Sequence, residues 1–497
     1  MDTLRLLGSL GAVNHSALTK DGVVDLEATT RNSLAHIFED LARHNTDKLY
    51  LYGVVQVRID VESDQVGTIK LHKHPEIPNL TYIYYFVPNM GAGQQHWMTT
   101  LPYARLAPYV QGALLYETVA APELYFNTYR SGVGRTIPLF TRVTGGFLDG
   151  YGCNNRYSNG DSIVSGFYNI FQQIYGLTEI QKEAMRDRLS QRVSFASLRN
   201  ILNRITIIPH GVNIPELYEL VEPEQGVVGW FGRGNQYKRI DYTFELYDKL
   251  FEMGVMKKCI ATAQPTGIKT IPVKGKARNH YVNLHESGHN FMDIGKEARL
   301  VLANNRDIPF PATLIQAAAY GTVPVLPDKP WAVGLLDNAP IYNTKRAALA
   351  ACKKLLTDDE FYTSTAKALR EEVAEKYNVA TQKAELAESL LDETERFYST
   401  NPDVNCPLLK YTPEKALAKY SWLEDVVETI QSRKEWRGTD LIHKIRPLRN
   451  GQYGNKFSWA GVHRLMQYLN YRDNLQHTLP TYHLNGITDA HRRYRVP

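Results

Sequence analysis

The chain has 497 residues, of which 43% are hydrophobic and 22% charged, which excludes a disordered or fibrous protein. This length predicts two large domains with further segments. No apolar run approaches the roughly 20 residues that span a bilayer, and the first residues lack the basic region of a secretion signal. We therefore expect no membrane span and a cytoplasmic location. The four cysteines form no CxxC pair, which predicts neither a zinc site nor a disulfide framework: Cys153, Cys259, Cys352 and Cys406.

The net charge of +5 is concentrated at the C-terminal end. Residues 433–497 contain 12 Lys and Arg but only 4 Asp and Glu, a surplus larger than that of the whole chain. The preceding residues are therefore net negative. Such an asymmetry indicates an anionic partner for this segment and says little about the fold.

The N-terminal part contains a few clear signals of secondary structure. In chain order we predict a helix over 29–44, strands over 49–59 and 81–88, a strand entering a helix over 161–176, and a strand at 204–220. Pro209, Gly211 and Pro215 interrupt the last segment, so a domain boundary is expected between residues 212 and 225.

From residue 227 onward, short apolar strands alternate with helical segments. The expected strands are 227–232, 258–265, 281–286, 299–305 and 322–327, and the expected helices are 241–254, 345–356 and 363–398. This alternation is typical of a doubly wound parallel sheet. We predict an α/β protein with an N-terminal domain over 1–215, a second domain over 216–398, and a basic, aromatic-rich, mainly helical extension over 399–497.

The stretch GWFGRGNQYKRID places Arg233, and five residues later Lys238, after the expected strand at 227–232. In doubly wound sheets, ligands bind at the carboxyl ends of the strands. Gly232 permits a close approach of the backbone, Arg233 offers a planar fork for phosphate oxygens, and Lys238 adds a point charge. The pattern indicates an anion site; a solvated basic loop is the alternative.

Two other loops carry candidate binding residues. A helix beginning at Pro311, Ala312 and Thr313 would offer free N–H groups to an anion, with Gln316 one turn further on, near a ribose or base. Gln316 facing solvent is the alternative. In the N-terminal domain, Gly91 and Gly93 follow a strand, which suits either a ligand-binding loop or a tight turn.

Three motifs together resemble the GT-B glycosyltransferases, especially the retaining, glycogen-synthase-like group. IIPHGVN resembles the hinge signature of that family, GRGNQYKRID its glycine-arginine element, and FPATLIQAAAYGTVPVLP the helix and strand after its acidic motif. The resemblance covers residues 205–330 well and 80–205 faintly. It implies two Rossmann-like domains that face a cleft, a nucleoside-diphosphate sugar as donor, most simply a UDP-sugar, and hexosyl or pentosyl transfer.

The resemblance also assigns roles to particular residues. Arg233 and Lys238 match the catalytic pair that holds the donor's diphosphate, so no divalent metal is required, and the sequence contains no Asp-x-Asp motif. The two glutamates of the family fall on Ile308 and Gln316, and the neighbouring Asp307 is the remaining acidic candidate. The family's N-terminal histidine has no clear counterpart; Asp149 and His96 are candidates for a polar or basic role at the acceptor. Retention and inversion both stay open.

The C-terminal extension carries the evidence on the acceptor. Cations interleaved with aromatic residues suit nucleic acid: Arg433, Lys434, Arg437, Lys444, Arg446, Arg449 and Lys456. An ordinary appendage packed on the N-terminal domain is the alternative. Phage glycosyltransferases that put sugar on hydroxymethylated DNA bases use the GT-B fold, and an acceptor of that kind would account for the charge. We therefore expect a hydroxymethylated base in double-stranded DNA as the acceptor, in a host cytoplasm. A polysaccharide, lipid-linked or protein acceptor, an inactive nucleotide-binding protein, and a nucleotide-sugar epimerase are the other readings.

Overall fold

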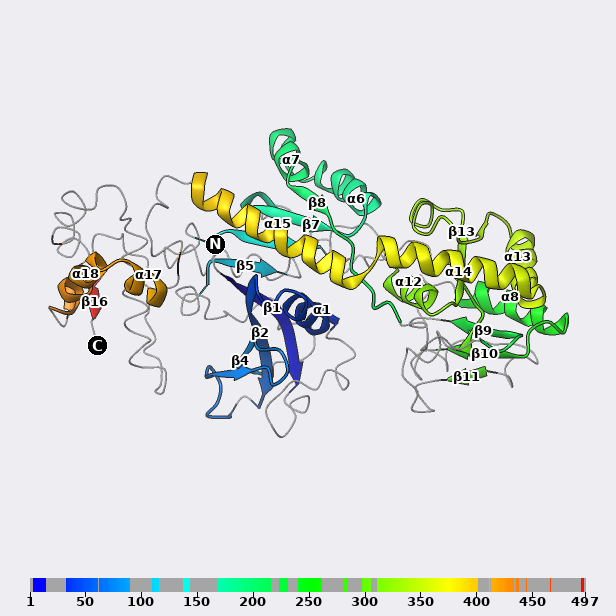
Figure 1. Cartoon of the computed structure of the whole chain (residues 1–497), viewed down its shortest axis with the longest axis horizontal. Helices are drawn as coiled ribbons and strands as arrows, with labels where there is room; N and C mark the ends of the chain where they lie inside the picture. Colours follow the sequence, from blue (N-terminus) through cyan, green and yellow to red (C-terminus); the bar gives the residue numbers. More distant parts are fainter. Residues whose placement is uncertain are drawn as a thin grey trace.

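The fold is described from a computed structural model. It describes the chain over residues 3–14, 33–60, 62–89, 110–115, 137–143, 168–215, 223–230, 240–261, 281–283, 297–304, 311–400, 411, 413–432, 435–437, 444, 465 and 493–495. Three parts follow one another along the longest axis: the C-terminal extension, the first sheet and the second sheet (Figure 1).

The first domain is built on an eight-stranded sheet of order β3-β4-β2-β1-β5-β6-β7-β8. Its neighbouring strands are parallel except for β3 against β4. The strands are β1 (Leu4–Asn14), β2 (Leu49–Ile59), β3 (Ile69–Lys73), β4 (Leu80–Pro88), β5 (Gly112–Leu115), β6 (Leu139–Arg142), β7 (Gln173–Gly176) and β8 (Ile205–Ile207). The helices are α1 (Ser33–Arg43), the 3-10 turn η5 (Tyr168–Ile170), α6 (Glu179–Leu189) and α7 (Phe195–Leu202).

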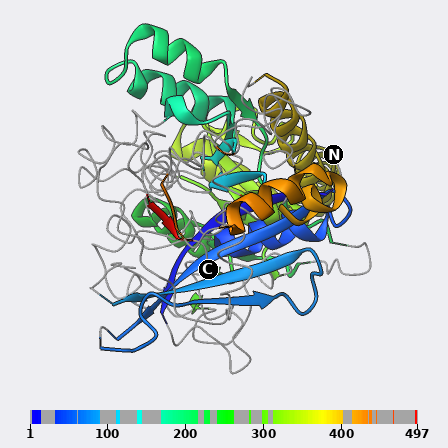
Figure 2. The ribbon, with the colours of Figure 1, turned by 90° about the vertical axis from the view of Figure 1, so that its left-hand side faces the viewer.

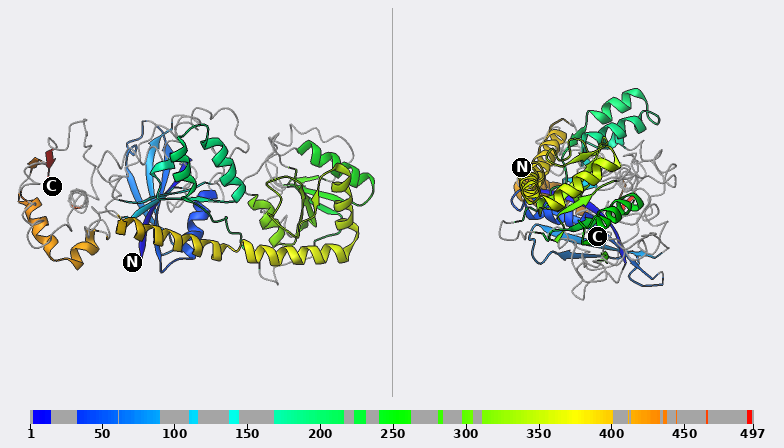
Figure 3. Two further views of the ribbon diagram at one scale, coloured as in Figure 1. Left: turned by 90° about the horizontal axis from the view of Figure 1, so that it is seen from above. Right: turned by 90° about the vertical axis from the view of Figure 1, so that its right-hand side faces the viewer.

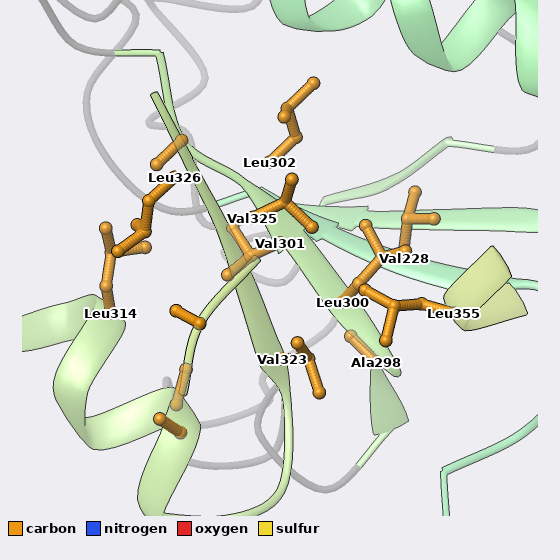
Figure 4. Close-up of a cluster of buried hydrophobic side chains, with 14 of the residues drawn as sticks. Val228, Ala298, Leu300, Val301, Leu302, Leu314, Val323, Val325, Leu326 and Leu355 are labelled. Atoms are coloured by element: carbon orange, nitrogen blue, oxygen red, sulfur yellow. The ribbon is translucent and has the colours of Figure 1, made fainter. Parts of the chain in front are cut away.

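The second domain contains a six-stranded sheet in which every pair of neighbours is parallel, in the order β11-β10-β9-β12-β13-β14. The strands are β9 (Val227–Trp230), β10 (Lys258–Ala261), β11 (Tyr281–Asn283), β12 (Leu300–Leu302), β13 (Val323–Pro327) and β14 (Ile341–Tyr342). The helices are α8 (Ile240–Glu252), α12 (Ala312–Ala319), α13 (Lys345–Thr357) and α14 (Asp359–Lys376). Figure 4 shows side chains of β9, β12 and β13 packed together in the core of this domain. The predicted α/β fold with two doubly wound sheets is confirmed.

The long helix α15 (Val379–Thr400) follows α14 and leads back to the first domain. The two helices run nearly end to end along both domains (Figure 3). Leu386, Ala387 and Leu390 of α15 are buried in the core that β1, β2 and α1 form. Helix α15 therefore packs against the first domain, although the sequence analysis assigned residues up to 398 to the second. The domain bounds 1–215, 216–398 and 399–497 stay predictions.

The C-terminal extension begins with α17 (Pro413–Lys419) and α18 (Trp422–Gln431), and β15 (Glu435–Arg437) pairs with β16 (Arg493–Arg495). Burial raises the pKa of Tyr52 in β2, and the charge of Glu414 in α17 adds to that increase. The charge of Glu414 acts on Tyr52 because α17 lies near the first sheet. Figure 2 shows α17 and α18 in front of that sheet when this end faces the viewer.

Two sequence predictions need correction. Residues 173–176 form strand β7, although 161–176 was expected to end as a helix. Phe171, Ile174 and Tyr175 are buried, since β7 lies inside the sheet between β6 and β8, and this burial outweighs helical periodicity. The central strand β1 was not predicted. Its segment is rich in Leu and Gly rather than β-branched residues, and a Cβ at Gly8 would lie 2.5 Å from the Phe38 ring of α1.

Candidate active site

The strand order of the second sheet locates its ligand-binding edge. If the six strands are numbered by their order in the chain, they lie side by side in the order 3-2-1-4-5-6. The direction of winding therefore reverses between β9 and β12. These two strands are direct neighbours, with Leu300 opposite Val228 and Val301 opposite Gly229. Doubly wound sheets bind ligands outside the carboxyl ends of the strands at such a switch point.

The predicted cationic loop leaves β9 at this point. β9 ends at the buried Trp230, and α8 begins at Ile240. Gly232, Arg233 and Lys238 belong to the connection between them, residues 231–239, which lie outside the described residues. Their role as donor ligands therefore stays a prediction.

The neighbouring strand β12 leads to the second predicted element, helix α12. Pro311 is its N-cap residue and makes no side-chain capping hydrogen bond. Ala312 is half-buried and Thr313 is exposed, so the first turn of the helix is accessible. Uncapped N–H groups at a helix start favour an anion. Asp307 and Ile308 lie outside the described residues.

Gln316 forms hydrogen bonds that the amino-acid sequence did not predict. Its side-chain Nε2 donates to the main-chain oxygen of Asn213 at 2.8 Å, and the N–H of Asn213 donates to Gln316 Oε1 at 3.2 Å. Asn213 belongs to the segment that connects the two domains. The expected contact of Gln316 with a ribose or base stays a prediction beside this observed pair.

The candidate acceptor residues follow strands of the first sheet. Gly91, Gly93 and His96 come after β4, and Asp149 comes after β6, so both groups leave carboxyl ends of parallel strands. All four lie outside the described residues, and their roles stay predictions.

Comparisons with solved structures reveal similar folds. HepE of Anabaena, in complex with UDP and glucose, matches with a TM-score of 0.51 at 12% identity, covering 78% of this chain and 100% of HepE. Trehalose-6-phosphate synthase of Burkholderia multivorans matches with a TM-score of 0.53 at 12% identity, covering 80% of this chain and 99% of the other. Sucrose-phosphate synthase of Thermosynechococcus elongatus matches with a TM-score of 0.52 at 12% identity, over 78% of this chain and 99% of that one. No family model and no curated protein matches the sequence.

These matches, with two doubly wound sheets in one chain, decide the fold. The chain has the GT-B fold. The GT-B resemblance of the three sequence motifs is thereby confirmed at the level of the fold.

Sequence reasoning missed a cluster of basic groups at the domain junction of this GT-B protein. Arg142, the last residue of β6, is 1% exposed. Its Nη2 donates to the main-chain oxygens of Ile208 at 2.8 Å and Pro209 at 2.9 Å, which follow β8. The available signal was a lone arginine within an apolar strand. This arginine holds the start of the interdomain connection to the first sheet.

Lys383 and His210 complete the basic cluster. Lys383 in α15 is 2% exposed; burial and then the nearby Arg142 lower its pKa to about 7, against a smaller opposing effect of Asp40. Burial, with Arg142 and Lys383, lowers the pKa of His210 well below its usual value. At neutral pH we therefore expect a neutral His210 and a Lys383 that is only partly protonated.

The predicted nucleic-acid-binding residues are described only in part. Arg437 lies in β15, at a position opposite Arg493 of β16, and Lys444 is exposed. Arg433, Lys434, Arg446, Arg449 and Lys456 lie outside the described residues. β16 lies beyond the first domain, on the side away from the second domain (Figure 1).

The described residues contain neither a cluster of metal ligands nor a membrane-spanning helix. Within the ranges that the structure describes, no three His, Cys, Asp or Glu residues are grouped as metal ligands. None of the described helices is long and apolar enough to cross a bilayer. Cys259 and Cys352 are free and buried, and burial raises the pKa of both thiols, that of Cys352 to about 12. Cys153 and Cys406 lie outside the described residues.

Proposed function

We propose that this GT-B protein transfers a sugar from a nucleoside-diphosphate sugar to an acceptor hydroxyl. One observation carries the proposal: the loop with Arg233 and Lys238 leaves β9 at the switch point, and the adjacent strand β12 leads to the uncapped start of α12. Two cations and a helix N-terminus would then converge on one anion. A diphosphate is the anion that suits such a set of groups.

The proposed chemistry breaks the bond between the anomeric carbon and the leaving phosphate oxygen. Negative charge then builds on the diphosphate, and the cations Arg233 and Lys238 with the N–H groups of α12 stabilise it. The acceptor oxygen forms the new bond and loses its proton. In an inverting reaction Asp149 or His96 would accept that proton. A UDP-sugar is the proposed donor, because HepE was solved with UDP-glucose.

A thermal-shift comparison tests the donor site. UDP is expected to raise the Tm of the wild type, because a ligand that binds only the folded state stabilises it. Arg233→Ala should lose most of this shift, whereas Arg346→Ala, an exposed arginine of α13, should keep it. An equal shift in all three proteins would show that Arg233 does not bind the nucleotide.

For the acceptor we propose a hydroxymethylated base in double-stranded DNA. The support is the basic, aromatic-rich composition of residues 433–497. Binding to duplex DNA should weaken steeply with salt, and Arg446→Ala with Arg449→Ala should reduce the slope, unlike Arg346→Ala. Absence of binding at low salt would redirect the search to polysaccharide, lipid-linked or protein acceptors.

An inactive nucleotide-binding protein is the second candidate. Ile308, at the position of the family's first glutamate, favours it, because its side chain cannot hydrogen-bond sugar hydroxyls. Slow hydrolysis of UDP-glucose by the wild type would exclude this candidate. Stabilisation by UDP without any hydrolysis would support it.

A further inference from the structure

The chain changes domain over a very short segment. Ile208 is buried in the core of the first domain and Val212 in the core of the second. On the return path, Tyr377 belongs to the second core and Leu386 to the first. Relative movement of the domains therefore has to be absorbed near residues 209–211 and between 378 and 385.

The two connections are joined to each other. The N–H of Val212 donates to the oxygen of Tyr377 at 2.8 Å, and the N–H of Val379 donates to the oxygen of Val212 at 3.1 Å. A Cβ at Gly211 would lie 2.2 Å from the Cα of Val379, which only a glycine avoids. The outgoing connection, which has its hinge at residues 209–211, and the return connection that begins at residue 378 are thus held in close contact.

Gln316 ties a third segment to this point. It lies in α12, 103 residues away in sequence from Asn213, and bonds both main-chain groups of Asn213. Asn213 directly follows Val212, which carries the hydrogen bonds to the other connection. Two hydrogen bonds of Gln316 thereby link helix α12 to the residue that follows Val212.

The two hydrogen bonds between residue 316 and Asn213 require a carboxamide at position 316. The main chain of Asn213 presents one donor and one acceptor to the same side chain, and a carboxamide has one group for each. A carboxylate only accepts, so glutamate would retain the bond from the N–H but repel the carbonyl oxygen. This requirement accounts for glutamine at position 316.

We propose that Gln316 is a positioning residue: its two hydrogen bonds to Asn213, called the clamp from here on, fix α12 against the exit of the interdomain connection and so hold the N-terminus of α12 in place. The consequence for catalysis rests on the proposed function, in which that N-terminus faces the donor. The clamp itself does not depend on it. In the clamp, Nε2 and Oε1 of Gln316 serve Asn213, and the contact with the ribose that the sequence predicts is the competing role.

Amide hydrogen exchange at Asn213 tests the clamp directly. Loss of one hydrogen bond of ordinary strength should speed exchange about fivefold in Gln316→Ala. Gln316→Glu should also speed it, because repulsion of the carbonyl loosens the pair. Gln431→Ala, an exposed glutamine of α18, should change nothing, and unchanged exchange in β9 and β12 would show that the variants are folded.

Added UDP separates a clamp from a ribose ligand. If the clamp persists, UDP leaves exchange at Asn213 of the wild type slow, and both Gln316 variants bind UDP more weakly. Faster exchange at Asn213 on adding UDP, or wild-type affinity in Gln316→Glu alone, would identify a ribose ligand and overturn the proposal. Unchanged exchange in both variants would also overturn it. If UDP does not bind the wild type at all, the proposed function fails while exchange at Asn213 still decides on the clamp.

Discussion

Lys383 lies in the first turns of α15, where Arg142 and the surrounding core leave it 2% exposed. Burial penalises the charged form of an amine, and a nearby cation adds to the penalty. The pKa is accordingly lowered from 10.5 to about 7. The residue type alone therefore does not predict the charge of Lys383, because burial and the nearby Arg142 decide whether its amine is protonated.

The lowered pKa predicts a pH-dependent stability. Between about pH 7 and pH 10.5 the unfolded chain binds a proton that folded Lys383 lacks, so the free energy of unfolding should rise with pH. Below pH 7 both states are protonated and the penalty is complete. Lys383→Met should therefore increase the free energy of unfolding at pH 6.5 and flatten the rise toward pH 10, as measured by urea unfolding. Lys353→Met, at an exposed position of α13, should do neither.

Helix α14 holds the connection between β13 and β14 through one carboxylate. Glu372 accepts hydrogen bonds from the N–H groups of Asp337 at 2.7 Å and Asn338 at 3.0 Å, and from Lys376 at 2.8 Å. Burial opposes the charge of Glu372, but these donors, together with Asn338 Nδ2 at 3.0 Å, outweigh it and lower its pKa. The element therefore stabilises a loop at the carboxyl end of β13.

Because the pKa of Glu372 is lowered, its contribution is present above its unfolded pKa near 4.5 and is lost as pH falls below it. Glu372→Gln should lower the free energy of unfolding by about 1–3 kcal/mol at pH 7, the usual cost of weakening charge-assisted hydrogen bonds. The difference from the wild type should shrink toward pH 3. Glu371→Gln, at the exposed neighbouring position, is the control; an equal loss in both variants would contradict the assignment.

At the scale of the whole molecule, sequence order and domain membership differ. α14 belongs to the second core through Leu369, whereas α15 belongs to the first core through Leu386 and Leu390. Tyr398 at the end of α15 also donates to the oxygen of Gln111, before β5, at 2.8 Å. The first domain is therefore complete only when the chain has returned from the second.

This arrangement predicts opposite responses to two matched substitutions. Leu386→Ala and Leu369→Ala each remove a fully buried leucine, at a cost of about 2–5 kcal/mol. Hydrogen exchange should accelerate in α1 and β2 for Leu386→Ala, and in α8 and β13 for Leu369→Ala. Faster exchange of the second domain in Leu386→Ala would contradict the assignment of α15.

The sequence by itself determined β9 to β13 and the helices α8, α12 and α13, because each is a short apolar run or a periodic segment, with a stop signal such as Gly254 (φ 70°) after α8. It also placed Arg233 and Lys238 after β9. It predicted neither β14 nor the break between α14 and α15. Only the tertiary structure decided that Gln316 bonds Asn213, that Arg142 and Lys383 meet at the junction, and that β1 and β7 are strands inside the first sheet. Those features depend on contacts between segments far apart in the chain, and such contacts leave no local pattern in the sequence.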